Sequence, residues 1–377
     1  MTSFSFQRVT AILVKEFIQL TRDRLTYAML LGVPVFQLLL FGYAINNDPH
    51  NLPTAVLVQE NSALARSTLA AIDNSGYFDI TTQARTPSEL DRLIARGQVQ
   101  FAITIPGDFT RRVVRGDKAQ ILVEADATDP AATGGAVAAL AQLPTEALRH
   151  DLTGALAERG KSERPFEVVI HRRYNPDNIS AYNIVPGLLG IVLSMTLVMM
   201  TSLGVTREQE RGTMESLLST PVQPIEVMIG KLAPYVVVGL IQTGLILLLA
   251  RLLFSVPMMG GWVGLSIGVL LFIVGSLALG FLISTIARTQ LQAMQLSFFY
   301  MLPSILLSGF MFPFRGMPAW TQAIGTMIPV THFLRVVRGA LLKGQSLADM
   351  APSLIALALF VCVITALALA RYRTTLD

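Results

Sequence analysis

The densest group of charged residues in the second half of the sequence is a short segment between two apolar runs. Five charged side chains lie within nine positions of this segment: Arg207, Glu208, Glu210, Arg211 and Glu215. The pattern predicts a short amphipathic helix that ends at Pro221. The orientation of a membrane chain depends on Lys and Arg, so a loop that only fixed orientation would gain little from glutamates. Two interpretations stay open: a helix that binds in a groove on a soluble partner, or a solvated loop with local ion pairs.

Residues that could support catalysis or bind a metal are not grouped. The four histidines are spread out and have no clustered acidic or cysteine partners at ligand spacing: His50, His150, His171 and His332. Cys362 is the only cysteine, which excludes an intrachain disulfide. The run Gly160-Lys161-Ser162 resembles the end of a phosphate-binding loop, but Gly154 is one residue too distant, and no nucleophile elbow is recognisable. The sequence therefore predicts no catalytic residues, no metal site and no cofactor on this chain.

The composition indicates that most of the chain lies in lipid. Only 14% of the 377 residues are charged, against about 25% in soluble proteins, and the mean hydropathy is +0.55. Six apolar runs are long enough to cross a hydrocarbon core of about 30 Å. These runs are Leu25 to Ile45, Ile184 to Val205, Leu232 to Leu253, Trp262 to Ile286, Ala293 to Phe312 and Pro352 to Ala370. An amphipathic segment with basic residues precedes the first run, so a surface helix followed by an uncleaved anchor is expected.

The six runs contain no Asp, Glu, Lys or His in their interior. Carriers driven by an ion gradient commonly need such groups within the membrane, so the sequence disfavours that class without excluding it. The basic residues are scattered and no aromatic-interleaved basic stripe is present, which argues against nucleic-acid binding despite a pI near 9.3.

Residues 47–178, between the first and second runs, have the pattern of an inserted mixed α/β domain. Short β-like runs are expected at Thr54 to Val58, Phe78 to Thr82, Val99 to Ile105, Ala119 to Val123 and Phe166 to His171. Helices are expected at Ala63 to Ile72, Pro87 to Ala95, Gly107 to Val114 and Ala131 to Arg159. Lys and Arg concentrate on the side of the membrane that holds both termini, so both termini are expected in the cytoplasm and the α/β domain outside it.

The segment 313–343 is apolar in places, but prolines and basic residues cut it into pieces too short to span a membrane. Two interfacial or re-entrant helices on the outer side are therefore expected. Aromatic residues of this region are expected at the level of the lipid headgroups: Phe310, Phe312, Phe314, Trp320 and Phe333.

Two blocks of residues resemble a known family. The first is similar to the signature loop of type-2 ATP-binding-cassette (ABC) exporter permeases: Glu210-x-Gly212-Thr213-x-Glu215-x-Leu217-Leu218-x-Thr220-Pro221, followed by Glu226 and Gly230-Lys231. The second resembles the pattern that these permeases carry between their last two spans: Ser308-Gly309-Phe310, Pro313, Met317-Pro318, Pro329, Arg338-Gly339 and Lys343-Gly344. The order of surface helix, single span and large outer domain is similar to the bacterial multidrug-type subgroup.

The resemblance implies an α-helical polytopic membrane protein with six transmembrane helices, acting as a non-catalytic exporter subunit for a hydrophobic or amphipathic, drug-like compound. It also implies partners: ABC ATPase subunits that hold ATP and Mg²⁺, and a second permease copy or a related permease, forming a dimer. The coupling helix that meets the ATPase would include Arg207, Glu208, Glu210, Arg211, Gly212, Thr213, Glu215, Leu217, Leu218 and Pro221. Membrane lipid is a further partner, and a periplasmic adaptor is a further candidate.

The expected organisation assigns each part of the chain a place in a bacterial inner membrane. The parts are a surface helix (1–24), helix 1 (25–46), the extracytoplasmic α/β domain (47–178), and helices 2 to 6 (179–377) with a coupling loop (206–231) and an outer re-entrant segment (313–343). Neutral polar side chains are expected to line the translocation path: Asn183, Ser194, Thr196, Thr201, Gln295, Ser297, Tyr300 and Ser304. Two other functions stay open, a membrane-anchored sensor or adaptor-binding protein and an ion-driven carrier.

Overall fold

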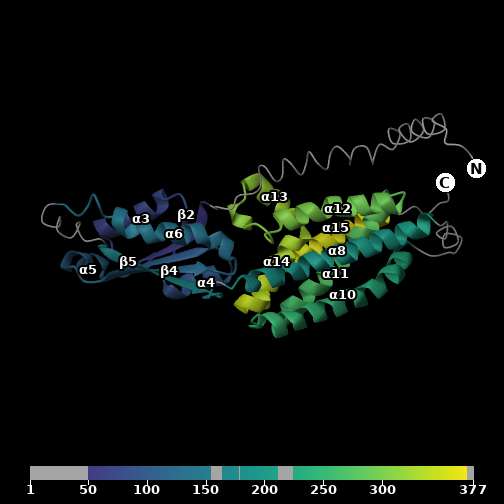
Figure 1. The fold of residues 1–377 in the computed structure, drawn as a ribbon, viewed down its shortest axis with the longest axis horizontal. Coiled ribbons are helices and arrows are strands. Elements are labelled where there is room, and N and C mark those ends of the chain that lie inside the picture. The colour runs from purple at the N-terminus through teal and green to yellow at the C-terminus, as the bar shows by residue number, and fades with distance from the viewer. Residues whose placement is uncertain (1–49, 154–163, 178, 211–223, 372–377) are drawn as a thin grey trace, which may run out of the picture.

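The computed structural model describes residues 50–153, 164–177, 179–210 and 224–371. Figure 1 shows an α/β region at one end of an elongated molecule and a bundle of long helices at the other. The bundle helices run roughly along the long axis, so one end of each helix faces the α/β region. The predicted surface helix and first span (1–46) lie outside the described residues.

A five-stranded sheet forms the centre of the α/β region. Its strands are β1 (Leu52–Val58), β2 (Phe78–Gln83), β3 (Phe101–Ile105), β4 (Ala119–Asp126) and β5 (Phe166–Arg173). Their order in the sheet is β2-β1-β3-β4-β5. The pairs are parallel except for β3 with β4, which are antiparallel. Each strand coincides with a predicted one, because alternating or fully buried apolar residues mark all five.

Helices α3 (Ala63–Asn74), α4 (Pro87–Ala95), α5 (Phe109–Arg115) and α6 (Pro130–Glu146) accompany the sheet. The start of α4 resembles a capping box: the side chain of the N-cap residue Thr86 accepts from Glu89 N, and the Glu89 carboxylate accepts from Arg85 N, one residue before the cap, at 2.9 Å. The predicted helix Ala131 to Arg159 extended too far. Helix α6 ends at Glu146, and the chain then turns so that Leu148 and Leu152 reach the apolar core of the α/β region.

The long helices of the bundle are α8 (Ser180–Glu210), α10 (Pro224–Phe254), α11 (Trp262–Ile286), α12 (Gln290–Leu307) and α15 (Leu347–Arg371). Four stretches among the described residues are long and apolar enough to cross a membrane: Ser180–Glu210, Lys231–Phe254, Trp262–Ile286 and Leu347–Arg371. Helix α12, for which a span to Phe312 was expected, ends at Leu307. The chain turns there at Gly309, which has a φ of +83° that a residue with a side chain rarely adopts.

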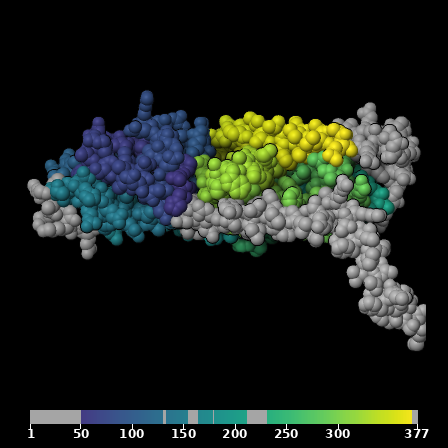
Figure 2. Space-filling view, turned by 90° about the horizontal axis from the view of Figure 1, so that it is seen from above, coloured from purple at the N-terminus to yellow at the C-terminus, as the bar shows by residue number. Residues whose placement is uncertain are grey.

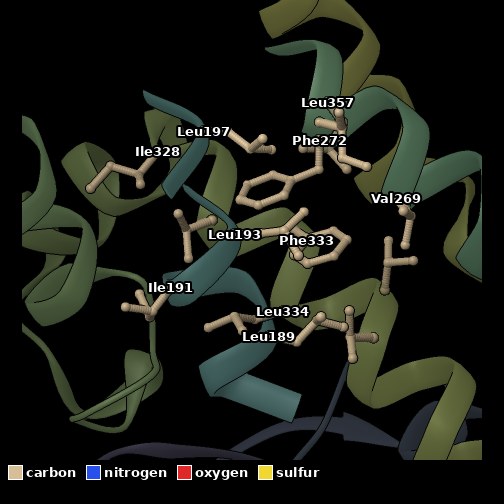
Figure 3. Close-up of a cluster of buried hydrophobic side chains, with 14 of the residues drawn as sticks. Leu189, Ile191, Leu193, Leu197, Val269, Phe272, Ile328, Phe333, Leu334 and Leu357 are labelled. Carbon is tan, nitrogen blue, oxygen red and sulfur yellow. The ribbon is translucent and has the colours of Figure 1, made fainter. Parts of the chain in front are cut away.

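The bundle is held together where α8, α11, α14 (Pro329–Arg338) and α15 meet. Figure 3 shows this cluster, in which Phe272 and Phe333 stack with centroids 4.1 Å apart. Phe333 is fully buried there, so its predicted place at the headgroup level was wrong: α14 turns this side chain into the bundle. Gly264 and Gly268 of α11 lie against Met350 of α15 and Val336 of α14, so this small-residue face packs within one chain.

The segment between α12 and α15 consists of short elements, as expected for a region that does not span. They are η2 (Phe314–Gly316), α13 (Ala319–Met327), α14 and the π-helical turn η3 (Gly339–Lys343). Figure 1 shows α13 and α14 at the end of the bundle that faces the α/β region.

The α/β region and the bundle are in direct contact. In Figure 2 the purple and blue surface of the α/β region meets the green and yellow surface of the bundle. An ion pair joins Lys343 of η3 to Asp126 of β4, and Gln345 Nε2 donates to the carbonyl of Ala95 at 2.7 Å. Near the start of α8, Asn183 Nδ2 donates to Asp129 Oδ1 at 3.3 Å. These polar contacts fix the end of the bundle against the sheet.

Candidate coupling site and transport path

The C-terminal end of α8 lies against the N-terminal end of α12, far from the α/β region. Backbone N of Gln290 donates to Glu210 Oε1 at 2.7 Å, and the Gln290 side-chain amide donates to the other carboxylate oxygen. Gln290 opens α12, and the first N–H groups of a helix have no partner inside the helix. The Glu210 carboxylate therefore acts as a cap for α12 and meets the positive end of its dipole.

Helix α10 is joined to the same end of α8. The ammonium group of Lys231 forms an ion pair with Glu208, and Arg207 Nε donates to Gln290 Oε1 at 3.3 Å. The N-cap residue of α12 is Thr289, whose side chain accepts from Gln292 N at 3.2 Å, so Thr289 and Glu210 bind different N–H groups in the first turn. Helices α8, α10 and α12 are thus tied to one another at this end by side-chain contacts.

The structure places three of the ten predicted coupling residues. Arg207, Glu208 and Glu210 lie together at the end of α8. The other seven lie outside the described residues: Arg211, Gly212, Thr213, Glu215, Leu217, Leu218 and Pro221. The assignment of this segment to coupling stays a prediction.

A line of hydroxyl groups runs along the seam between α8 and α12. The two helices are antiparallel there, because Glu210 of α8 meets Gln290 of α12 and Ser202 Oγ lies 3.0 Å from Ser297 Oγ. Farther along, the Tyr300 hydroxyl of α12 is buried near Ser194 of α8, but neither hydroxyl group has a hydrogen-bond partner among the described residues. Ser304 Oγ donates instead to the backbone carbonyl of Tyr300 at 2.9 Å. The structure therefore brings four of the predicted path residues together: Ser194, Ser297, Tyr300 and Ser304.

The other predicted path residues point elsewhere or lack a partner. Thr196 Oγ1 accepts from Gln242 Nε2 of α10 at 3.2 Å. Thr201 packs against Gly280 of α11, where an added Cβ would lie 2.8 Å from Thr201 Cβ. Asn183 binds Asp129 of the α/β region. Gln295 Oε1 is buried and has no hydrogen-bond partner among the described residues. Of the eight predicted path residues, four thus lie at the α8–α12 seam, three make contacts elsewhere, and Gln295 Oε1 has no partner among the described residues.

Sequence reasoning missed three residues that complete these contacts: Ser202, Gln242 and Gln290. Gln242 had a visible signal, because it interrupts an otherwise apolar stretch of α10 together with Thr243. Gln290 follows Thr289, a typical N-cap residue, and so marked a helix start. Ser202 had no distinguishing signal, since its pairing with Ser297 depends on the rotation of two helices.

The sequence comparisons agree with this architecture. A family model described as "ABC-2 family transporter protein" matches residues 24–370. The chain belongs to the ABC-2 transporter family. The match to the family model covers both the α/β region and the long apolar helices.

Three curated relatives come from Escherichia coli K12. The chain is 33% identical to "Probable multidrug ABC transporter permease YbhS" over 348 residues, covering 90% of each chain. It is 26% identical to "Probable multidrug ABC transporter permease YbhR", covering 91% of this chain and 92% of the relative. It is 29% identical to "Inner membrane transport permease YhhJ", covering 86% of each. The chain is thus an ABC-2 membrane permease, a transport component without catalytic function.

Proposed function

We propose that this permease is the membrane-spanning subunit of an exporter, powered by a separate ATPase subunit that binds ATP and Mg²⁺. The observation that carries the proposal is the packing at the end of α8. There Glu208 and Glu210 join α8 to α10 and α12, directly beside segment 211–223. A partner that pushed on this segment would displace three helices that are already linked.

The proposed topology has six membrane spans. They are the four long apolar stretches, α12, and the apolar run 25–46 that precedes the α/β region. Both termini and the coupling loop (206–231) lie in the cytoplasm, and the α/β domain (47–178) and the segment 313–343 lie outside. The distribution of Lys and Arg in the loops supports this orientation. The protein resides in a bacterial inner membrane and works as a dimer with a second copy or a related permease.

The proposed cargo is a hydrophobic or amphipathic, drug-like compound that passes along the α8–α12 seam. The hydroxyl groups of Ser194, Ser202, Ser297 and Tyr300 give this seam neutral polar character between apolar helices. The word "multidrug" in the names of two relatives supports the substrate class. Neutral groups can hydrogen-bond to varied compounds without the cost of burying a charge in the membrane.

The proposed mechanism is a rigid-body movement. ATP binding draws the two ATPase subunits together, and their closure presses on the coupling helices of the dimer. Because Glu210 caps α12 and Glu208 binds Lys231 of α10, α8, α10 and α12 tilt as a unit. Tilting of packed helices opens the path to one side of the membrane and closes it to the other.

Reconstitution tests this proposal. The full chain is placed in proteoliposomes alone and with the ATPase subunits that co-purify with it, and both ATP hydrolysis and dye transport are measured. We expect vectorial transport only with the partner. Glu210→Ala removes the cap of α12 and should lower transport per ATP hydrolysed by roughly tenfold, since hydrogen bonds to a charged group are worth about 1.5–3 kcal/mol.

The matched control is Asp73→Ala, which removes one exposed carboxylate from α3 of the α/β region. This variant should transport as the wild type does. Equal transport by Glu210→Ala and Asp73→Ala would contradict the coupling role of Glu210. Transport by the chain alone along an ion gradient would favour a carrier, and the absence of both ATPase and transport would favour a sensor.

A further inference from the structure

A cavity of about 610 Å³ lies at the junction of the α/β region with the outer end of the bundle. Its walls come from the loop before β3, the ends of β4 and α4, and the segment from Ser308 to Ser353. Figure 1 shows α13 and α14 at this junction. The cavity lies on the far side of the bundle from the coupling residues, so it is separate from that site.

Basic side chains outnumber acidic ones in this cavity. The described lining contains five basic residues, which are Arg96, Arg315, Arg335, Arg338 and Lys343, and three acidic residues, which are Asp126, Asp129 and Asp349. Two of the acids are paired with basic neighbours: Asp126 with Lys343, and Asp349 with Arg96 at 2.9 Å. Asp129 accepts a hydrogen bond from Asn183. The other three basic residues, Arg315, Arg335 and Arg338, form what we call the arginine cluster.

No member of the arginine cluster forms an ion pair with a carboxylate of the described chain. Arg315 donates to the backbone carbonyls of Gly97 and Gln98. Arg338 donates to Gly309 O at 3.0 Å, and its buried Nε has no hydrogen-bond partner among the described residues. The guanidinium of Arg335 lies over the Phe314 ring, 4.9 Å from the centroid. The cluster therefore has guanidinium N–H groups left over for a ligand.

The positive charges also act on one another. Burial lowers the pKa of Arg335 from its ordinary value, and the positive charge of Arg315 lowers it further. Burial likewise lowers the pKa of Arg338, an effect that Asp129 and Asp126 oppose. Arginine nonetheless keeps its charge in proteins. A buried anion placed among these groups would relieve both the repulsion and the unsatisfied hydrogen bonds.

We propose that the arginine cluster is a binding site for a phosphate group at the outer surface of the membrane. Planar guanidinium groups bind phosphate oxygens through paired, charge-assisted hydrogen bonds. The buried hydroxyl of Ser308 lines the same cavity and has no hydrogen-bond partner among the described residues, so it provides a further neutral donor.

Two features favour the phosphate of a lipid headgroup over free phosphate. The cavity is much larger than a phosphate ion, whose volume is comparable to that of a few waters of about 30 Å³ each. Helix α13 lines the cavity with Gln322 and Thr326. Its other side carries exposed apolar side chains at helical spacing, Trp320, Ile324 and Met327. A short helix with this distribution can lie at the membrane surface and bring a headgroup to the cluster.

The test uses the full-length chain and requires neither ATPase nor transport, so its failure is distinct from failure of the proposed function. Retained phosphatidylglycerol is measured by native mass spectrometry after purification in a neutral detergent. Binding of radiolabelled inorganic phosphate to delipidated protein is measured by equilibrium dialysis. Arg335→Gln is the chosen variant because the Arg335 side chain makes no hydrogen bond to another described residue and only lies over the Phe314 ring. It should weaken lipid retention by roughly tenfold, the loss expected for charge-assisted hydrogen bonds.

The matched control is Arg115→Gln, which removes one exposed positive charge from α5 at the opposite end of the α/β region. Arg335→Lys keeps the charge and should retain more lipid than Arg335→Gln. Lipid retention that falls only in Arg335→Gln supports a headgroup site, and phosphate binding with the same dependence but no retained lipid supports a free-anion site. Absence of both ligands from the wild type, or equal binding by Arg335→Gln and Arg115→Gln, would overturn the proposal.

Discussion

Replacing Lys343 by methionine should loosen the contact between the α/β region and the bundle. Lys343 and Asp126 are only 8% and 10% exposed, so their ion pair is well shielded from water. Removing one partner of a buried pair leaves the other charge unpaired, at a cost of about 3–5 kcal/mol. Asp126 keeps hydrogen bonds from the backbone and hydroxyl of Thr128, at 3.2 and 2.8 Å, which places the expected cost near the lower limit.

Hydrogen exchange measured by mass spectrometry on the full chain in nanodiscs reports this loosening. About 3 kcal/mol corresponds to a roughly hundredfold change in an opening equilibrium. Peptides that cover the end of β4 and the turn η3 should therefore exchange about a hundred times faster in Lys343→Met. Peptides from α3, at a distance from the junction, serve as the internal control.

The double variant Asp126→Asn with Lys343→Met completes the test. A neutral amide in place of the carboxylate removes the unpaired charge, so the double variant should exchange more slowly than Lys343→Met alone. Unchanged exchange in Lys343→Met, or a double variant whose effect equals the sum of the two single effects, would refute the reasoning.

Three further predictions concern packing and pH. Gly280→Ala should lower the melting temperature in detergent by an amount equivalent to about 1–3 kcal/mol, because the added Cβ would lie 2.7 Å from Val198 O. The control is Gly244→Ala, whose added Cβ would meet no atom within 4 Å. Equal melting temperatures of the two variants would contradict the close approach at Gly280. Phe333→Ala should cost about 3–5 kcal/mol through lost contacts with Phe272, whereas Phe298→Ala, 48% exposed, should be nearly neutral. Burial raises the pKa of Glu60, but hydrogen bonds from Ser62 and Thr110 outweigh it and hold the pKa below 4.5. The ionised carboxyl therefore contributes stability above pH 4.5 that is lost as pH falls through the lowered value. Glu60→Gln should accordingly make unfolding less dependent on pH below 4.5, and an unchanged acid dependence would count against this role.

The α/β region was predictable because its signals are local. Five runs with alternating or continuous apolar residues became five strands, and Thr86, Pro87 and Glu89 marked the start of α4. The end of α6 was misjudged because alanine-rich sequence continues beyond it. What stops the helix is the burial of Leu148 and Leu152 in the core, which is a tertiary effect.

The sequence showed which polar residues interrupt the apolar runs, but not which of them lie together. Ser194, Ser297, Tyr300 and Ser304 lie along the α8–α12 seam, and their place in a transport path stays a prediction. Thr196 and Thr201 face α10 and α11 instead, because uniformly apolar helices give no signal for their rotation. Phe333 was misplaced for a similar reason: aromatic residues suit both a headgroup layer and a packed core, and only its stacking on Phe272 decides between them.

Helix α8 is longer than a membrane span requires and makes a contact near each of its ends. Its 31 residues extend about 46 Å at about 1.5 Å per residue, well beyond a hydrocarbon core of about 30 Å. Asn183 near one end binds the α/β region, and Glu210 at the other end binds α12. Binding at the two ends of one rigid helix is coupled, and the coupling is the same in both directions. A ligand at one end that favours a particular tilt of the helix must bind more tightly when the opposite end is already held in that tilt. The α/β region is therefore thermodynamically linked to whatever binds the opposite end of α8.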